Sequence, residues 1–208
     1  MPVISDGNNV LGDASTDLQS VSGSIQISGS LALVPPSGSN DHRIGVGTLT
    51  PKTALSVVND YTTDFEDQIA DGEGGGEILR YNPGTDPSTT VGQLYYLHTN
   101  GIWANTDADA VATGGSQLLG IAMGTSPRND GMLLRGFVRV PATEVKNIPG
   151  SGAVDGLPLY VSIVAGHVDF SAPSGSSDFV RVVGYAIDDD NGDVLAYFNP
   201  DGTWVVVS

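Results

Sequence analysis

Glycine and proline interrupt this chain at short intervals, and no other feature constrains its fold as strongly. The 208 residues include 28 Gly and 12 Pro, well above the average share of about 12% for the two together. Both residues destabilise helix interiors, so long helices are disfavoured. Hydrophobic residues still make up 39% of the chain, which is too much for a disordered polymer. The sequence therefore predicts an all-β protein with many short strands and turns.

Charge and cysteine content exclude several classes of partner. The chain has 8 Lys and Arg against 24 Asp and Glu, a formal net charge of −16. Nucleic acids and anionic membranes are bound through Lys and Arg, so we expect neither as a partner. Cysteine is absent, which excludes disulfides and thiolate sites. His is present only 3 times, which leaves little material for a transition-metal site. We expect no cofactor.

The first residues, MPVISDGNNVLGD, contain neither a basic region nor an apolar core. They do not have the pattern of a secretory signal peptide. No stretch approaches the roughly 20 apolar residues that span a bilayer. We therefore expect a protein that is made in a cytoplasm and is not inserted into a membrane.

Residues 1–59 are predicted to form an extended, glycine-rich β arm or short shaft. Apolar residues alternate there with Ser, Gln and Gly, as in strands with one buried face, and the segment has no aromatic residue. Such a segment cannot build its own core, so its apolar stripe must be buried against another copy or another protein. The residues predicted to make these trimer or docking contacts are Val21, Ile25, Ile27, Leu31, Leu33, Ile44 and Leu55.

Residues 60–76 are predicted to form a junction. Tyr61, Phe65 and Ile69 are spaced as on one face of a short helix. The run GEGGGE, which begins at Gly72, is predicted to end that helix and to form a flexible turn.

Residues 77–208 contain an internal repeat. GQLYYLHTNGIWANT begins at Gly92, GLPLYVSIVAGHVDFS begins at Gly156, and in each unit another glycine, Gly120 or Gly184, follows 28 residues later. Each unit is predicted to form a hairpin, a loop of small residues and a second hairpin, giving a pseudo-repeated β-sandwich or barrel. The predicted turns are Asn100-Gly101, Asp130-Gly131, Asn191-Gly192 and Asp201-Gly202.

Four motifs of common enzyme classes are missing from the sequence. It has no G-x-S-x-G, Walker, H-E-x-x-H or C-x-x-C motif, so we do not expect an enzyme. The acidic run DDDNGD offers Asp188, Asp190 and Asp193 as a weak Ca²⁺ candidate. Its spacing does not fit an EF-hand, and a solvated hairpin loop is the simpler interpretation. No metal site is predicted.

Aromatic residues of the C-terminal region allow two interpretations. Tyr95, Trp103 and Phe170 could stack on the sugar rings of a glycan. The simpler alternative is that aromatic residues on alternating strands form the core of the β-domain, which we define as residues 77–208.

Two segments resemble shafts of bacteriophage fibre proteins. One is GDASTDLQSVSGSIQISGS, and the other is RIGVGTLTPKTALSVVN, which is similar to the shaft motif I-G-I-G-T-x-x-P-x-x-x-L-x-V. The region from VGQLYYL to YFNPDGTWVVV looks like a terminal β-domain of phage tail-fibre-like and other virion proteins. The expected shaft is shorter than that of a long tail fibre, and we expect no C-terminal chaperone domain.

The resemblance implies a non-enzymatic virion structural protein, either a trimeric short fibre or a capsid decoration or head-fibre protein. Its expected partners are two further copies of itself and a capsid or baseplate protein, and its expected location is the virion surface. The alternative is a glycan-binding module of a tail fibre that recognises a receptor on the host surface.

Overall fold

The computed structural model describes residues 44–46, 55–57, 69–81, 88–150, 154–190 and 192–208. The chain divides into two units, residues 1–60 and 61–208, which we describe separately. The described residues form strands and no α-helix, with two single-turn 3₁₀ helices, η2 (Val111–Thr113) and η3 (Ala142–Glu144). The all-β prediction is therefore confirmed. No helix in the described ranges has the length and hydropathy needed to cross a membrane.

In the first unit, the described residues form one pair of strands. β1 (Ile44–Val46) and β2 (Leu55–Val57) are parallel, with Ile44 opposite Leu55 and Val46 opposite Val57. Both strands lie within the segment RIGVGTLTPKTALSVVN, residues 43–59.

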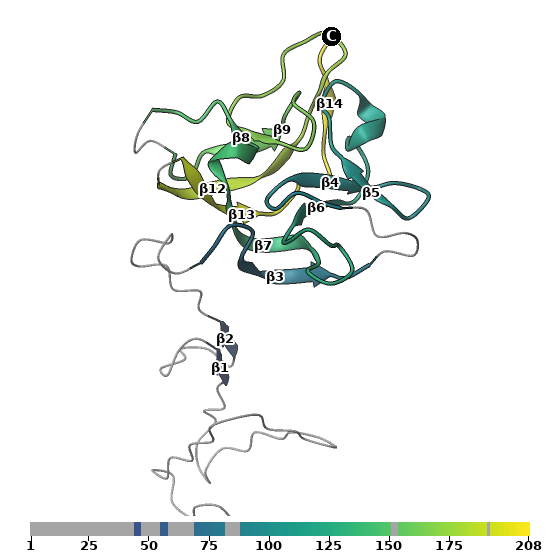
Figure 1. Cartoon of the computed structure of the whole chain (residues 1–208). Helices are drawn as coiled ribbons and strands as arrows, with labels where there is room; N and C mark the ends of the chain where they lie inside the picture. Colours follow the sequence, from purple (N-terminus) through teal and green to yellow (C-terminus); the bar gives the residue numbers. More distant parts are fainter. Residues whose placement is uncertain (1–43, 47–54, 58–68, 82–87, 151–153, 191) are drawn as a thin grey trace, which may run out of the picture. The chain divides into compact units, whose positions relative to one another are not determined.

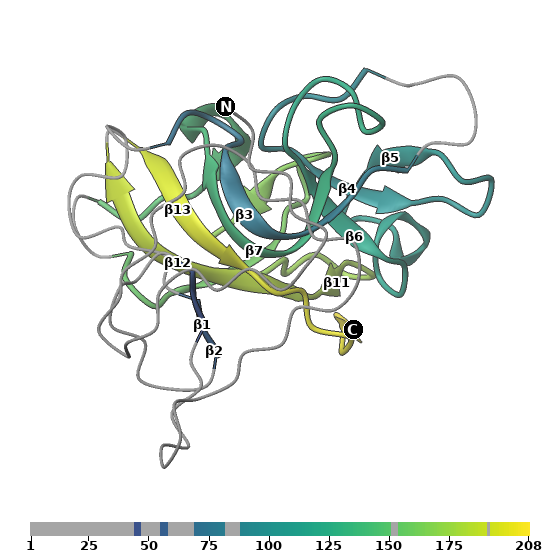
Figure 2. The same cartoon turned by 90° about the horizontal axis from the view of Figure 1, so that it is seen from below.

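In the second unit, the described residues form one curled, mixed sheet of ten strands that makes a half-barrel (Figures 1 and 2). Nine of them follow the order β5-β4-β6-β7-β13-β12-β9-β10-β8, and β3 pairs with β7. A separate pair joins β11 (Phe179–Val180) to β14 (Val205–Val206). The strands of the large sheet are β3 (Gly74–Leu79), β4 (Leu94–Leu97), β5 (Trp103–Asn105), β6 (Leu119–Ala122), β7 (Met132–Val140), β8 (Val145–Lys146), β9 (Pro158–Val161), β10 (Val168–Asp169), β12 (Val182–Asp190) and β13 (Asp193–Phe198).

The long strand β7 holds this sheet together. Along one edge it pairs with β3. Along the other edge it pairs first with β6, through Met132 and Leu133, and then with β13, from Gly136 to Val140. The partner of β7 therefore changes around Gly136.

The prediction of a flexible turn through the run GEGGGE was wrong for most of that run. Gly72 lies in a turn, but Gly74 begins β3. Gly76 of β3 lies directly opposite Gly136 of β7, whose φ is +144°. A Cβ atom on Gly136 would come within 2.2 Å of the Gly75 carbonyl oxygen. The glycines therefore permit a close approach of two backbones, a known use of glycine inside strands.

The predicted turns lie between strands. Gly101 connects β4 to β5, Gly131 immediately precedes β7, and Gly192 connects β12 to β13. Residues 201–202 lie between β13 and β14. Of the predicted junction helix, residues 61–68 lie outside the described ranges, and Ile69 is not helical.

Buried apolar side chains of the sheet form two hydrophobic clusters. The larger cluster contains residues of β4, β6, β7, β9 and β13, among them Leu94, Ile121, Val138, Leu159 and Phe198. The smaller one consists of Tyr95, Trp103, Ala122 and Met132, with Leu79, Leu97 and Leu134 packed against it. Neighbouring residues of β4 and β6 belong to different clusters, so both faces of the sheet are covered there.

Candidate functional site

Five of the seven predicted trimer and docking residues lie outside the residues that the structure describes. They are Val21, Ile25, Ile27, Leu31 and Leu33. Ile44 and Leu55, the other two, are paired across β1 and β2. Their contact role stays a prediction.

The three predicted sugar-stacking residues lie in or against the core. Tyr95 is 4% exposed and Trp103 is 2% exposed. The Trp103 Nε1–H donates to the Tyr81 carbonyl oxygen at 3.1 Å. Phe170 is half-buried and packs against the larger cluster. In this chain, Tyr95 and Trp103 offer no open ring face to a sugar.

The acidic run around β12 and β13 uses one of its carboxylates internally. Asp193 accepts from the Arg139 Nε at 3.0 Å and from the Ala142 backbone N–H at 2.7 Å. Asp188 is exposed, and the side chain of Asp190 lies outside the described part. Among the described residues, no group of three or more His, Asp or Glu side chains could hold a metal ion.

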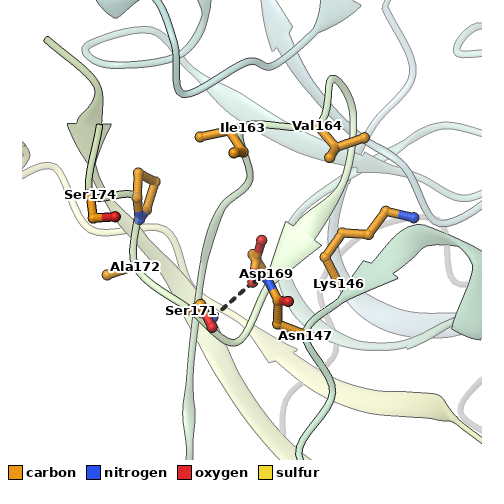
Figure 3. Close-up of a pocket in the computed structure, with 9 residues that line it drawn as sticks. Lys146, Asn147, Ile163, Val164, Asp169, Ser171, Ala172 and Ser174 are labelled. Atoms are coloured by element: carbon orange, nitrogen blue, oxygen red, sulfur yellow. Dashed lines mark hydrogen bonds between the residues drawn. The ribbon is translucent and has the colours of Figure 1, made fainter. Parts of the chain in front are cut away.

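A pocket of about 330 Å³ lies beside β10 (Figure 3). Ile163 and Val164 are exposed, while the carboxylate-bearing Asp169 is only 4% exposed. Its walls combine apolar side chains with polar and charged ones, and convergent polar groups are a usual feature of small-molecule sites. The lining residues are Lys146, Asn147, Ile163, Val164, Asp169, Ser171, Ala172, Pro173 and Ser174.

The buried Asp169 carboxylate is bound by the chain itself. It accepts hydrogen bonds from the Asn147 Nδ2 at 2.8 Å, the Ser162 Oγ at 3.0 Å and the Ser171 backbone N–H at 2.8 Å. The last bond is drawn in Figure 3. Three donors satisfy most of the acceptor capacity of a carboxylate. We therefore interpret Asp169 as a group that orders the loops around β10.

A second polar cluster joins distant parts of the sheet. The Gln93 Nε2 donates to the Glu144 Oε2 at 2.8 Å, and the His167 Nε2 lies 3.4 Å from that same oxygen. The Asn105 Nδ2 donates to the Gln93 Oε1 at 2.8 Å. This cluster connects β4 and β5 with η3 and with the turn between β9 and β10.

Arg181 provides a third polar connection. It is 6% exposed, and its Nη1 donates to the carbonyl oxygens of Gly114, Gly115 and Gln117 at 2.6, 3.1 and 2.9 Å. Burial lowers the pKa of the Arg181 guanidinium, and Asp201 opposes that shift. Arg181 is not among the residues predicted from the sequence, although a lone arginine in the apolar run FVRVV is an available signal.

Comparison of the chain with protein-family models, with curated proteins and with solved structures finds no match.

Proposed function

We propose that this protein is a non-enzymatic structural component of a bacteriophage particle. In this proposal it forms a trimeric short fibre or a capsid decoration or head-fibre protein on the virion surface. Residues 1–59 associate with other copies and dock on a capsid or baseplate protein, and the β-domain projects outward. The resemblance of the N-terminal segments to fibre shafts supports the proposal.

The parallel pairing of β1 with β2 is the observation that best supports association of residues 1–59 with other copies. Eight residues separate the two strands in sequence, fewer than the dozen or so of a usual helical crossover between parallel strands. A pair of three-residue strands has little stability alone. Association with further copies would supply the missing partner surface.

We further propose that the β-domain contains two structural repeats. The two repeats share antiparallel strand pairs. For four residue pairs of the first repeat, adding 64 to both residue numbers gives a pair in the second. Ala122 lies opposite Met132, as Ala186 lies opposite Ala196. Further matching registers are Tyr95–Gly120 with Leu159–Gly184, Leu94–Ile121 with Pro158–Tyr185, and Ile121–Leu133 with Tyr185–Tyr197.

The native mass of the purified chain, measured by light scattering on a sizing column, tests the trimer. We expect three times the chain mass of 21.4 kDa. Ile25→Asp and Ile27→Asp should each abolish trimers or particle attachment and leave the circular dichroism of the β-domain unchanged. Full trimer formation and full particle occupancy by both variants would contradict the assignment of these residues.

A glycan-binding module of a tail fibre is the second candidate function. The observation that favours it is an exposed aromatic residue beside a cavity, and this residue is not among the three predicted from sequence. Tyr185 on β12 is 45% exposed and lines a cavity. Screening the full chain on an array of host-surface glycans would test this candidate.

A further inference from the structure

A cavity of about 360 Å³ lies where the end of β13 passes the beginning of β12. It differs from the pocket beside β10 because an exposed aromatic residue contributes to its wall. Its lining residues are Val182, Tyr185, Asn199, Pro200, Asp201 and Gly202.

Tyr185 provides the apolar part of this site. In the sheet it lies opposite Pro158 of β9 and Tyr197 of β13, so strands on both sides hold its backbone. Its side chain is nevertheless 45% exposed. Large aromatic side chains with an open face and a polar tip are frequent at binding surfaces. The C–H face of a pyranose ring is a suitable partner for such a ring.

Asp201 and Asn199 provide the polar part. The Asp201 Oδ1 accepts from the Thr203 backbone N–H at 2.8 Å, and hydrogen bonding from Thr203 lowers the pKa of the Asp201 carboxyl. Asp201 is therefore an ionised acceptor at neutral pH. The Asn199 side chain makes no hydrogen bond to another described residue, so its amide can both donate and accept.

The loop that carries these groups is fixed before a ligand arrives. The Asn199 backbone N–H donates to the Val183 carbonyl oxygen, and the Asp201 backbone N–H donates to the Val182 carbonyl oxygen, each at 2.9 Å. The Arg181 Nε donates to the Asp201 carbonyl oxygen at 2.7 Å. Preorganisation of this kind lowers the entropic cost of binding.

The negative charge of the site and of the chain favours neutral sugars over acidic ones. The Asp201 carboxylate and the net charge of −16 repel sialic and uronic acids. The nearby guanidinium of Arg181 is buried and donates to backbone carbonyl groups, so it is not free to bind the carboxylate of an acidic sugar directly.

We propose that this cavity binds one neutral pyranose residue of a surface glycan, with the sugar's C–H face on Tyr185 and its hydroxyl groups on Asp201 and Asn199. This inference rests on the second candidate function and is independent of the trimer.

The test begins with the full chain on an array of neutral and anionic glycans. The best neutral ligand is then titrated by calorimetry into the wild type, Tyr185→Ala, Tyr185→Phe and Asp201→Asn. Tyr81→Ala is the matched control, because Tyr81 is 42% exposed and does not line the cavity. We expect Tyr185→Ala to weaken binding about tenfold or more, equivalent to about 1.4 kcal/mol. Tyr185→Phe should keep most of the affinity, and Tyr81→Ala all of it.

The other outcomes are distinct. Binding that survives both Tyr185→Ala and Asp201→Asn would overturn this site and leave a glycan-binding function elsewhere on the chain. Binding of anionic glycans alone would overturn the neutral-sugar assignment. Failure to bind any glycan would overturn both the site and the second candidate function. Circular dichroism of each variant separates lost binding from lost folding.

Discussion

The two four-strand groups of the β-domain, which we propose are repeats, share several strand registers but bury different residues. The first group consists of β4, β5, β6 and the start of β7, and the second of β9, β10, β12 and β13. Ile121 of the first group and Tyr185 of the second occupy corresponding register positions. Ile121 is 1% exposed, whereas Tyr185 is 45% exposed.

An irregularity in β7 accounts for part of this difference. The pairing of β3 with β7 shifts between Glu77 and Ile78, and Leu134 of β7 is left without a partner there. A one-residue shift moves the following side chains to the opposite face of a sheet. Leu133 and Val138 accordingly belong to the same cluster although five positions separate them. Strand register and the choice of buried face are thus set by separate features of the sequence.

Ile121→Ala and Tyr185→Ala together make the sharpest test of this difference. Ile121 lies in the larger cluster, so its truncation should cost about 2–5 kcal/mol of unfolding free energy through lost burial and a cavity. Truncation of the exposed Tyr185 should cost less than about 1 kcal/mol. Urea unfolding of both variants measures the two costs, and equal costs would contradict the asymmetry.

Arg181→Met tests how the two groups are connected. Arg181 precedes β12 of the second group, and its carbonyl partners Gly114, Gly115 and Gln117 precede β6 of the first. Methionine keeps the apolar stem and removes the donors, which should cost about 1–3 kcal/mol per buried group left unpaired. Denaturant titration gives the total, and a loss below about 0.5 kcal/mol would show that the connection is dispensable.

Glu144→Ala should have a smaller effect on the same connection. It removes the acceptor shared by Gln93 and His167, and we expect a loss of about 1–2 kcal/mol. Glu144→Gln is the control, because its amide oxygen can still accept from Gln93. Unfolding midpoints of the two variants should therefore differ, and identical midpoints would argue against the shared acceptor.

The smallest expected effect is a difference between the pKa values of Asp109 and Asp201. The neighbouring Asp107 carboxylate raises the pKa of Asp109, whereas hydrogen bonding from Thr203 lowers the pKa of Asp201. The contribution of Asp201 to stability is therefore present above its unfolded-state pKa and is lost as the pH falls through its folded-state pKa. That of Asp109 is present at low pH and is lost as the pH rises through its folded-state pKa. Carboxyl-carbon NMR titration should show Asp109 titrating above Asp201, and the reverse order would contradict both assignments.

The strands and turns were largely predictable because they depend on local residues. Alternating apolar residues and turn glycines such as Gly101 and Gly192 act over a few positions. The run GEGGGE was misinterpreted because glycine has the same local signature in a turn and in a strand that approaches another backbone. That approach depends on Gly136, which is distant in sequence.

The candidate sites were harder to predict for a related reason. Alternation suggests that one of Tyr95 and Tyr96 faces solvent, but both are buried at 4% and 7% exposure. Tyr95 belongs to the smaller cluster and Tyr96 to the larger one, so material covers both faces of β4. No local pattern reports such coverage, and the same is true of the open face at Tyr185.

The position of β7 between three other strands has a consequence for how the domain comes apart. Because β7 pairs with strands of both groups, neither group can lose its structure without exposing an edge of the other. The β-domain should melt in a single transition, with the amide protons of β7 among the last to exchange with solvent. Two fragments made by dividing the chain between β8 and β9 would each lack a neighbour for an inner strand, so they should regain their fold only when mixed.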